Sequence, residues 1–165
     1  MCRQRYVIAG GCRFLCKKIS TAVCGNNCLG YALRIALLVS PSQLRRDLVE
    51  HLRTDPDNLM LSMSIVEDSD GMTERQLLAK AIQELSGDCM IPADVFLHFV
   101  NSNQRSVIRA NYVFFAQEGD NYVPVMSHWE NKRRYPTFYV GCNSENTHYS
   151  KLVIQDTVSL NEHIV

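Results

Sequence analysis

The sequence contains no apolar run near the ~20 residues that a membrane-spanning helix requires. It also lacks an apolar N-terminal segment followed by a small-residue cleavage site, so we expect no signal peptide. Neither sign of charge is in excess, because 17 lysine and arginine residues balance 17 aspartate and glutamate residues. This balance argues against a protein that binds nucleic acid through its overall charge. We therefore expect neither nucleic acid nor a membrane as a partner.

The seven cysteines are odd in number and unevenly spread, which is unlike the disulfide framework of a small secreted protein. We expect a reducing compartment, which is the cytosol or, for a delivered effector, the cytosol of a host cell. The 165 residues are 46% hydrophobic and 21% charged, typical of one globular domain with its own core.

Helical patterns fill most of the first two-thirds of the chain. Ser40 is expected to cap a helix with Pro41 at its first position. Thr73 and Gln76 have the spacing of a capping box, in which each side chain satisfies the other's end of the helix start. The apolar spacing predicts helices over 28–40, 41–54, 74–85 and 92–100. A short helix is predicted over 12–19.

Strand patterns dominate the last third. They predict strands over 107–115, 122–126, 137–140 and 149–154, and an early strand over 5–9 that Gly10 and Gly11 end. This separation predicts an α+β fold, with a helical N-terminal part packed on a small, mostly antiparallel sheet. We expect residues 1–19 to be an N-terminal arm or the remnant of a longer chain, and residues 20–165 to form the main domain.

A Gly/Asn-rich turn runs into Cys28, which opens an apolar helical run. Gly25, Asn26 and Asn27 tolerate unusual backbone conformations, so their N–H groups could converge on an anion. In the first turn of a helix, Cys28 would favour the thiolate, as a nucleophilic cysteine requires. The alternative is that Cys28 is a small buried hydrophobic residue.

The segment GNNCLGYAL resembles the nucleophile motif D-G-N-C-L-F-x-A of the ovarian-tumour (OTU) family, papain-like deubiquitinating cysteine proteases. The matching positions are Asn27, Cys28, Leu29 and Ala32, whereas Gly25, Asn26 and Gly30 replace the family's Asp, Gly and Phe. Thr147-His148-Tyr149 is similar to the family's second motif, a histidine followed by an aromatic residue. The resemblance covers roughly residues 20–155.

The resemblance implies an OTU fold and a thiol-dependent hydrolase that removes ubiquitin or a ubiquitin-like modifier from proteins. Its partners would be ubiquitin or such a modifier, and ubiquitinated proteins. Cys28 would be the nucleophile and His148 the base, with the N–H groups of Gly25, Asn26 and Cys28 as the oxyanion hole. Ser150 stands where many members have an Asp or Asn that orients the histidine. Tyr149 and Trp129 would form the walls of a narrow groove for the ubiquitin tail, and neither a metal nor another cofactor is implied.

Three alternatives stay open. His128 is the reserve candidate for the base, and His98 is expected to be a core or boundary histidine rather than a ligand. The four cysteines Cys12, Cys16, Cys24 and Cys28 could hold a structural zinc ion, although tight zinc knuckles usually have a shorter spacing. Because Ser150 carries no charge, a non-catalytic ubiquitin-binding module is the third alternative.

Overall fold

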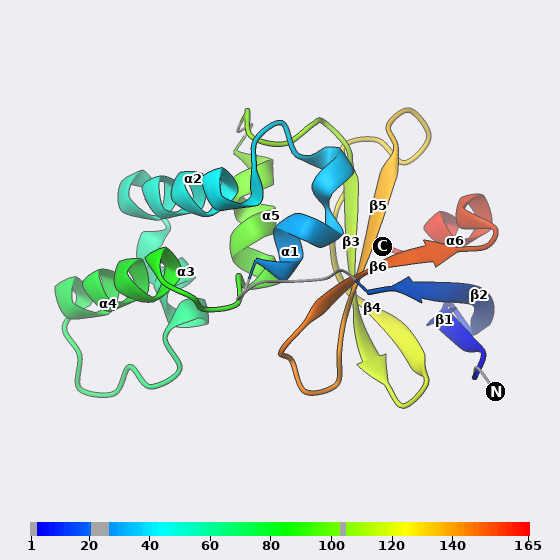
Figure 1. The fold of residues 1–165 in the computed structure, drawn as a ribbon, viewed down its shortest axis with the longest axis horizontal. Coiled ribbons are helices and arrows are strands. Elements are labelled where there is room, and N and C mark those ends of the chain that lie inside the picture. The colour runs from blue at the N-terminus through cyan, green and yellow to red at the C-terminus, as the bar shows by residue number, and fades with distance from the viewer. Residues whose placement is uncertain (1–2, 21–26, 103–104) are drawn as a thin grey trace.

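The computed structural model describes residues 3–20, 27–102 and 105–165. A helical half and a six-stranded sheet lie side by side (Figure 1). The helices are α1 (Cys28–Ala32), α2 (Pro41–Thr54), α3 (Asn58–Ile65), α4 (Glu74–Ser86), α5 (Ala93–Asn101) and α6 (Thr157–Glu162). The strands are β1 (Arg5–Ala9), β2 (Cys12–Ile19), β3 (Asn111–Glu118), β4 (Asn121–His128), β5 (Thr137–Cys142) and β6 (Tyr149–Ile154).

The first two strands form a hairpin that belongs to the sheet. Gly10 and Gly11 both have positive φ angles, 56° and 75°, as a tight two-residue turn between twisted strands requires. β1 also pairs with β4, and β2 pairs with β6. The predicted helix over 12–19 is therefore wrong. Phe14 and Cys16 are buried on either side of the exposed Leu15, which is the two-residue period of a strand.

The sheet closes on itself in the order β1-β2-β6-β5-β3-β4. The β3–β5 and β1–β4 pairs are parallel and the other four are antiparallel. The expected α+β class with a mostly antiparallel sheet is thus confirmed, but the sheet is closed and includes the segment that we expected to be an arm. Strand β3 serves two cores, because Tyr112 and Phe114 pack with the helices whereas Val113 and Phe115 point into the closed sheet.

The predicted helix starts are confirmed at two positions. Ser40 Oγ accepts a hydrogen bond from the Gln43 N–H at 3.1 Å, and Thr73 and Gln76 form the capping box before α4. Helix α1 is much shorter than the predicted 28–40. The chain that follows it pairs instead with residues 106–108, where the Leu38 N–H donates to the Ser106 carbonyl at 2.8 Å.

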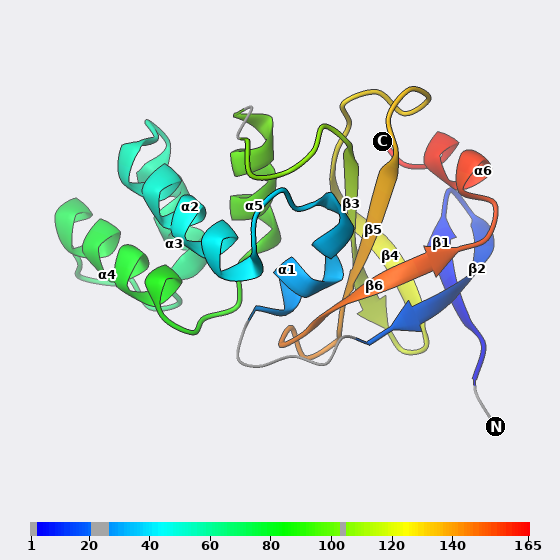
Figure 2. The ribbon, with the colours of Figure 1, turned by 45° about the horizontal axis from the view of Figure 1, so that its top comes forward.

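Two helices were not predicted. In α3 apolar residues occur on all sides, with Met60 and Met63 exposed, so no amphipathic period marks it. Helix α6 follows β6. It packs on the core inside the closed sheet, on the side away from α2–α5 (Figure 2). Among the residues described, no helix has the length and apolar character needed to cross a membrane.

Candidate active site

Cys28 is the first residue of α1, where this short helix meets the start of β6 (Figure 2). The backbone N–H of Tyr149 donates to Cys28 Sγ at 3.4 Å, which joins two residues 121 positions apart. Only 2% of the Cys28 surface is exposed. This contact ties the start of β6 to the cysteine at the start of α1.

His148 immediately precedes Tyr149, and the β5–β6 loop holds its backbone in place. Asn143 Oδ1 accepts hydrogen bonds from the N–H groups of Thr147 at 2.8 Å and His148 at 3.0 Å. The Asn143 N–H donates in turn to the His148 carbonyl at 3.1 Å. The structure therefore brings Tyr149, the residue that follows His148, to Cys28. Cys28 and His148 are the two residues on which the sequence motifs are centred.

Asn143 is a site residue that the sequence analysis missed. The signal was its place in the turn-rich segment before His148, since asparagine side chains often bond to nearby backbone groups. Asn146 in the same loop has a φ angle of 57°, a left-handed conformation that asparagine tolerates better than most residues.

Ser150 and Tyr149 are both buried in β6. Ser150 is 3% exposed and lies opposite Gly141 of β5. The Tyr149 hydroxyl donates to the Ile91 carbonyl at 2.8 Å, and its ring meets Phe114 edge to face. Burial raises the pKa of Tyr149, so the phenol stays neutral and anchors the strand. The same residue lines a cavity of about 560 Å³ beside the β5–β6 loop.

Trp129 and His128 lie away from this site. His128 ends β4 opposite Tyr112, near the start of β3, whereas Cys142 and Tyr149 lie level with Ala116 at the other end. Four strand residues separate these levels, about 13 Å. The structure thus corrects the expectation that Trp129 forms a wall of the groove, and it leaves the reserve base His128 without access to Cys28. Trp129 is instead covered by Lys132, whose Nζ lies 4.5 Å from the ring centroid.

The four-cysteine zinc alternative does not fit. Cys12 and Cys16 are four residues apart on one extended strand, so their Cα atoms are about 13 Å apart. Two sulfurs on one zinc ion, each ~2.3 Å from it, lie within about 4.6 Å of each other. Cys16 is level with Ile154 at the far end of β6 from Tyr149, which separates it from Cys28 as well. Cys24 lies outside the described residues.

Asn27, the residue before Cys28, is held by a buried arginine. Arg45 is 7% exposed, its Nε donates to Asn27 Oδ1 at 3.1 Å, and its guanidinium also donates to the Leu85 carbonyl at 2.9 Å. Arg45 is buried because it points from α2 toward α1 and α4. Gly25 and Asn26, the other expected oxyanion-hole residues, lie outside the described residues.

Gly30 explains how α1 approaches α2 so closely. A Cβ atom at this position would lie 2.7 Å from the Cβ atom of Pro41, closer than packed side chains allow. The Phe that the OTU motif has at this position has no room here. Gly30 therefore sets the position of the helix that carries Cys28.

A second thiol lies near the site but is a poor competitor for the nucleophile's role. Burial raises the pKa of Cys142, and negative charge on Cys28 raises it further. Cys142 therefore stays protonated at neutral pH while its Sγ contacts Asn146 Oδ1 at 3.1 Å. Among the cysteines that the structure describes, Cys28 is the one that accepts a hydrogen bond from the backbone of β6.

These features define an α+β fold in which a helix carries a cysteine to the strand that follows a histidine. OTU domains are among the solved structures that share this fold. They include an OTU deubiquitinase from Wolbachia pipientis wMel, with a TM-score of 0.55 and 13% identity over 90% of this chain and 96% of that chain. The viral OTU domain protease from Farallon virus has a TM-score of 0.55 and 11% identity over 87% of this chain and 86% of that chain. The OTUD1 OTU domain has a TM-score of 0.50 and 13% identity over 84% and 85%.

No known family profile matches the sequence, and no curated protein does. At 11–13% identity these likenesses concern the fold, and the fold is the one that the resemblance of the two short motifs implied.

Proposed function

We propose that this protein is a thiol-dependent deubiquitinase. It would hydrolyse the peptide or isopeptide bond at the C-terminus of ubiquitin or a ubiquitin-like modifier through a thioester on Cys28. The observation that carries the proposal is the Tyr149 N–H donating to Cys28 Sγ, because it brings the start of the histidine strand to the thiol. The fold shared with OTU proteases from a virus and a bacterium supports the same chemistry.

In the proposed reaction His148 takes the proton from Cys28, and the thiolate sulfur attacks the carbonyl carbon of the modifier's C-terminal glycine. The N–H groups of Cys28 and of Gly25 and Asn26, which precede it in the sequence, stabilise the developing oxyanion. The C–N bond then breaks, His148 protonates the leaving amine, and water hydrolyses the thioester.

Ser150 is proposed to orient His148. A hydroxyl accepts a hydrogen bond from an imidazole N–H and so selects a tautomer, but it stabilises the imidazolium less than a carboxylate does. Its burial at 3% exposure keeps water from competing for that bond. We therefore expect a slower enzyme than one with an aspartate at this position.

The test measures hydrolysis of isopeptide-linked diubiquitin and of modifiers that carry a fluorophore on the C-terminal carboxyl. We expect Cys28→Ala to abolish hydrolysis and His148→Gln to lower kcat/KM by roughly 100- to 10,000-fold. Cys12→Ser and His128→Gln are matched controls, because both lie away from the site. Ubiquitin binding by a folded protein that hydrolyses none of these substrates would instead support the non-catalytic module.

The partner, ubiquitin or a ubiquitin-like modifier, and the reducing compartment expected from the sequence stay predictions.

A further inference from the structure

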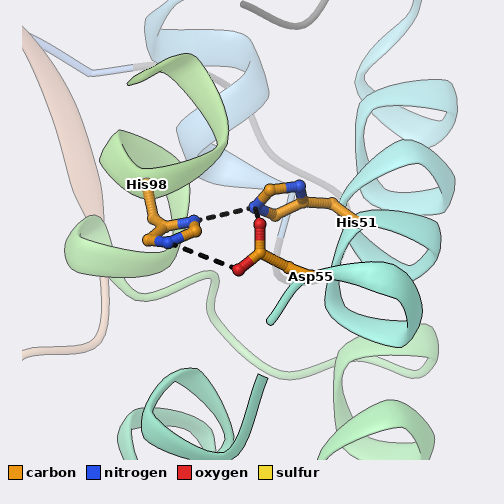
Figure 3. Close-up of side chains that lie close together, drawn as sticks. All are labelled: His51, Asp55 and His98. Atoms are coloured by element: carbon orange, nitrogen blue, oxygen red, sulfur yellow. Dashed lines mark hydrogen bonds and ion pairs between the residues drawn. The ribbon is translucent and has the colours of Figure 1, made fainter. Parts of the chain in front are cut away.

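Two histidines and an aspartate meet between α2 and α5, in the helical half of the molecule (Figure 3). His51 and Asp55 are four residues apart on α2 and its C-cap, which places them on one face of the helix. His98 comes from α5, and its Nδ1 lies 2.9 Å from His51 Nε2. One donor atom from each of the three residues lies within 4.8 Å of the other two.

We propose that His51, Asp55 and His98 bind a divalent transition-metal ion, with Zn²⁺ as the ion whose ligand preferences fit best. The ligand atoms would be His51 Nε2, His98 Nδ1 and an Asp55 carboxylate oxygen. Two imidazoles and one carboxylate leave a fourth tetrahedral position for water. This site is separate from the four cysteines considered above, and it uses none of the residues of the proposed active site.

A second carboxylate gives this cluster the outer shell of a metal site. His98 Nε2 lies 3.0 Å from Asp57 Oδ2 and 3.5 Å from Asp55 Oδ1. An Nε2–H that donates to Asp57 leaves the lone pair of His98 on Nδ1, which faces His51. Histidines that ligate metal usually donate their other ring N–H to a carboxylate or carbonyl in this way.

Burial also suits a metal site. The His51 side chain is 4% exposed, that of Asp55 13% and that of His98 21%, so the cluster is shielded but open on the His98 side. The edge of the His51 ring packs on Phe99, with 5.4 Å between centroids, which restricts its rotation.

Without metal, His51 and His98 would form a hydrogen-bonded pair of imidazoles. The distance between their facing nitrogens and a measurement of metal binding distinguish such a pair from a metal site. Two nitrogens that share one tetrahedral zinc ion lie about 3.3 Å apart. The observed 2.9 Å requires a movement of roughly 0.4 Å, and the Asp55 oxygen that lies 3.7 Å from His51 Nε2 must approach. These shifts are within the reach of side chains at a helix end and a partly exposed histidine.

The ion would join α2 to α5. We expect metal-free protein in which Cys28 is replaced by Ala to bind one Zn²⁺ per chain by calorimetry. His98→Gln and Asp55→Asn should each weaken Zn²⁺ binding by about 100-fold or more, and Asp57→Asn by about 10-fold through the outer shell. His128→Gln is the matched control, since His128 lies away from this cluster and pairs with Glu130, and it should change affinity less than about 2-fold.

Cobalt identifies the ligands independently of affinity. Bound Co²⁺ should give the visible absorption of tetrahedral nitrogen and oxygen ligation, without the thiolate-to-metal charge-transfer band in the near ultraviolet. Circular dichroism of each metal-free variant checks that it is folded, and His98→Gln is the primary variant because His98 is the more exposed histidine.

Two results would overturn the proposal. Zn²⁺ binding that persists in His98→Gln and Asp55→Asn would place the ion elsewhere, and a thiolate band with Co²⁺ would place it on cysteines. No binding by folded, metal-free protein would show that the cluster is a hydrogen-bonded pair alone. Neither result bears on hydrolysis by Cys28.

Discussion

Asn143 and His148 are joined in both directions, because the Asn143 side chain accepts the His148 N–H at 3.0 Å and the Asn143 N–H donates to the His148 carbonyl at 3.1 Å. The pair closes the β5–β6 loop and sets where β6 begins. The position of the candidate base therefore depends on a side chain that takes no part in the chemistry.

Replacing Asn143 with Ala should lower kcat roughly 10-fold and leave KM nearly unchanged. The backbone of His148 loses its acceptor, so the imidazole samples more positions, whereas substrate contacts stay intact. Steady-state hydrolysis of a fluorogenic ubiquitin substrate measures both constants. Asn143→Asp retains an acceptor oxygen and should restore most of the rate; equal losses in both variants would contradict this positioning role.

Arg45→Met should lower the free energy of unfolding by about 2–4 kcal/mol. The change leaves the buried Leu85 carbonyl and the Asn27 side chain without their guanidinium donor, and such unsatisfied groups are costly. Urea unfolding monitored by circular dichroism gives the value. Arg46→Met on the exposed face is the control and should change stability by less than about 0.5 kcal/mol.

Gly30→Ala should destabilise the protein by about 1–3 kcal/mol and slow thioester formation. The added Cβ would lie 2.7 Å from Pro41 Cβ, so α1 must move away from α2 and take Cys28 with it. Gly87→Ala is a matched control, because its Cβ would meet nothing closer than 3.5 Å. Thermal unfolding of both variants tests the comparison, and equal melting temperatures would argue against close packing at Gly30.

Alkaline stability should depend in part on Cys16. Burial raises the pKa of this thiol to about 11, although nearby Arg5 acts in the opposite direction. In the unfolded chain the Cys16 thiol has a pKa of about 8.5. Above that pH the folded state binds more protons than the unfolded state, so the free energy of unfolding falls as the pH rises toward 11.

Cys16→Val removes this titration. The free energy of unfolding should fall by up to about 3 kcal/mol more in the native protein than in the variant between pH 8 and 11. Comparing the two proteins at each pH cancels the buried tyrosines, whose raised pKa values act in the same direction. Parallel pH profiles would show that Cys16 ionises as freely in the folded protein as in the unfolded chain.

Local signals in the sequence predicted the helix starts and the later strands. The Ser40 cap, the Thr73–Gln76 capping box and strands β3–β6 depend on short-range chemistry that neighbouring residues encode. The first hairpin was partly missed because the alternation around Phe14 spans too few residues to distinguish a strand from a helix. Closure of the sheet depends on pairing between distant strands, which no local pattern contains.

The site was predicted as far as short motifs allow. Cys28 and His148 were identified by the types of residues around them, and the structure brings the start of the histidine strand to Cys28. Arg45 and Asn143 were missed because each acts through a partner that only the fold brings close. From the sequence, His98 was expected to be an ordinary core or boundary residue. Its neighbours His51 and Asp55 lie on another helix, and only the fold brings the three together.

The most direct test of the proposed nucleophile uses ubiquitin whose C-terminus carries an electrophile that traps a thiolate. Intact mass spectrometry of the native protein should show one added ubiquitin, and peptide mapping should place the bond on Cys28. The adduct should be absent from Cys28→Ala and form far more slowly in His148→Gln. An adduct of undiminished yield in folded Cys28→Ala would contradict the account by placing the reactive thiol elsewhere.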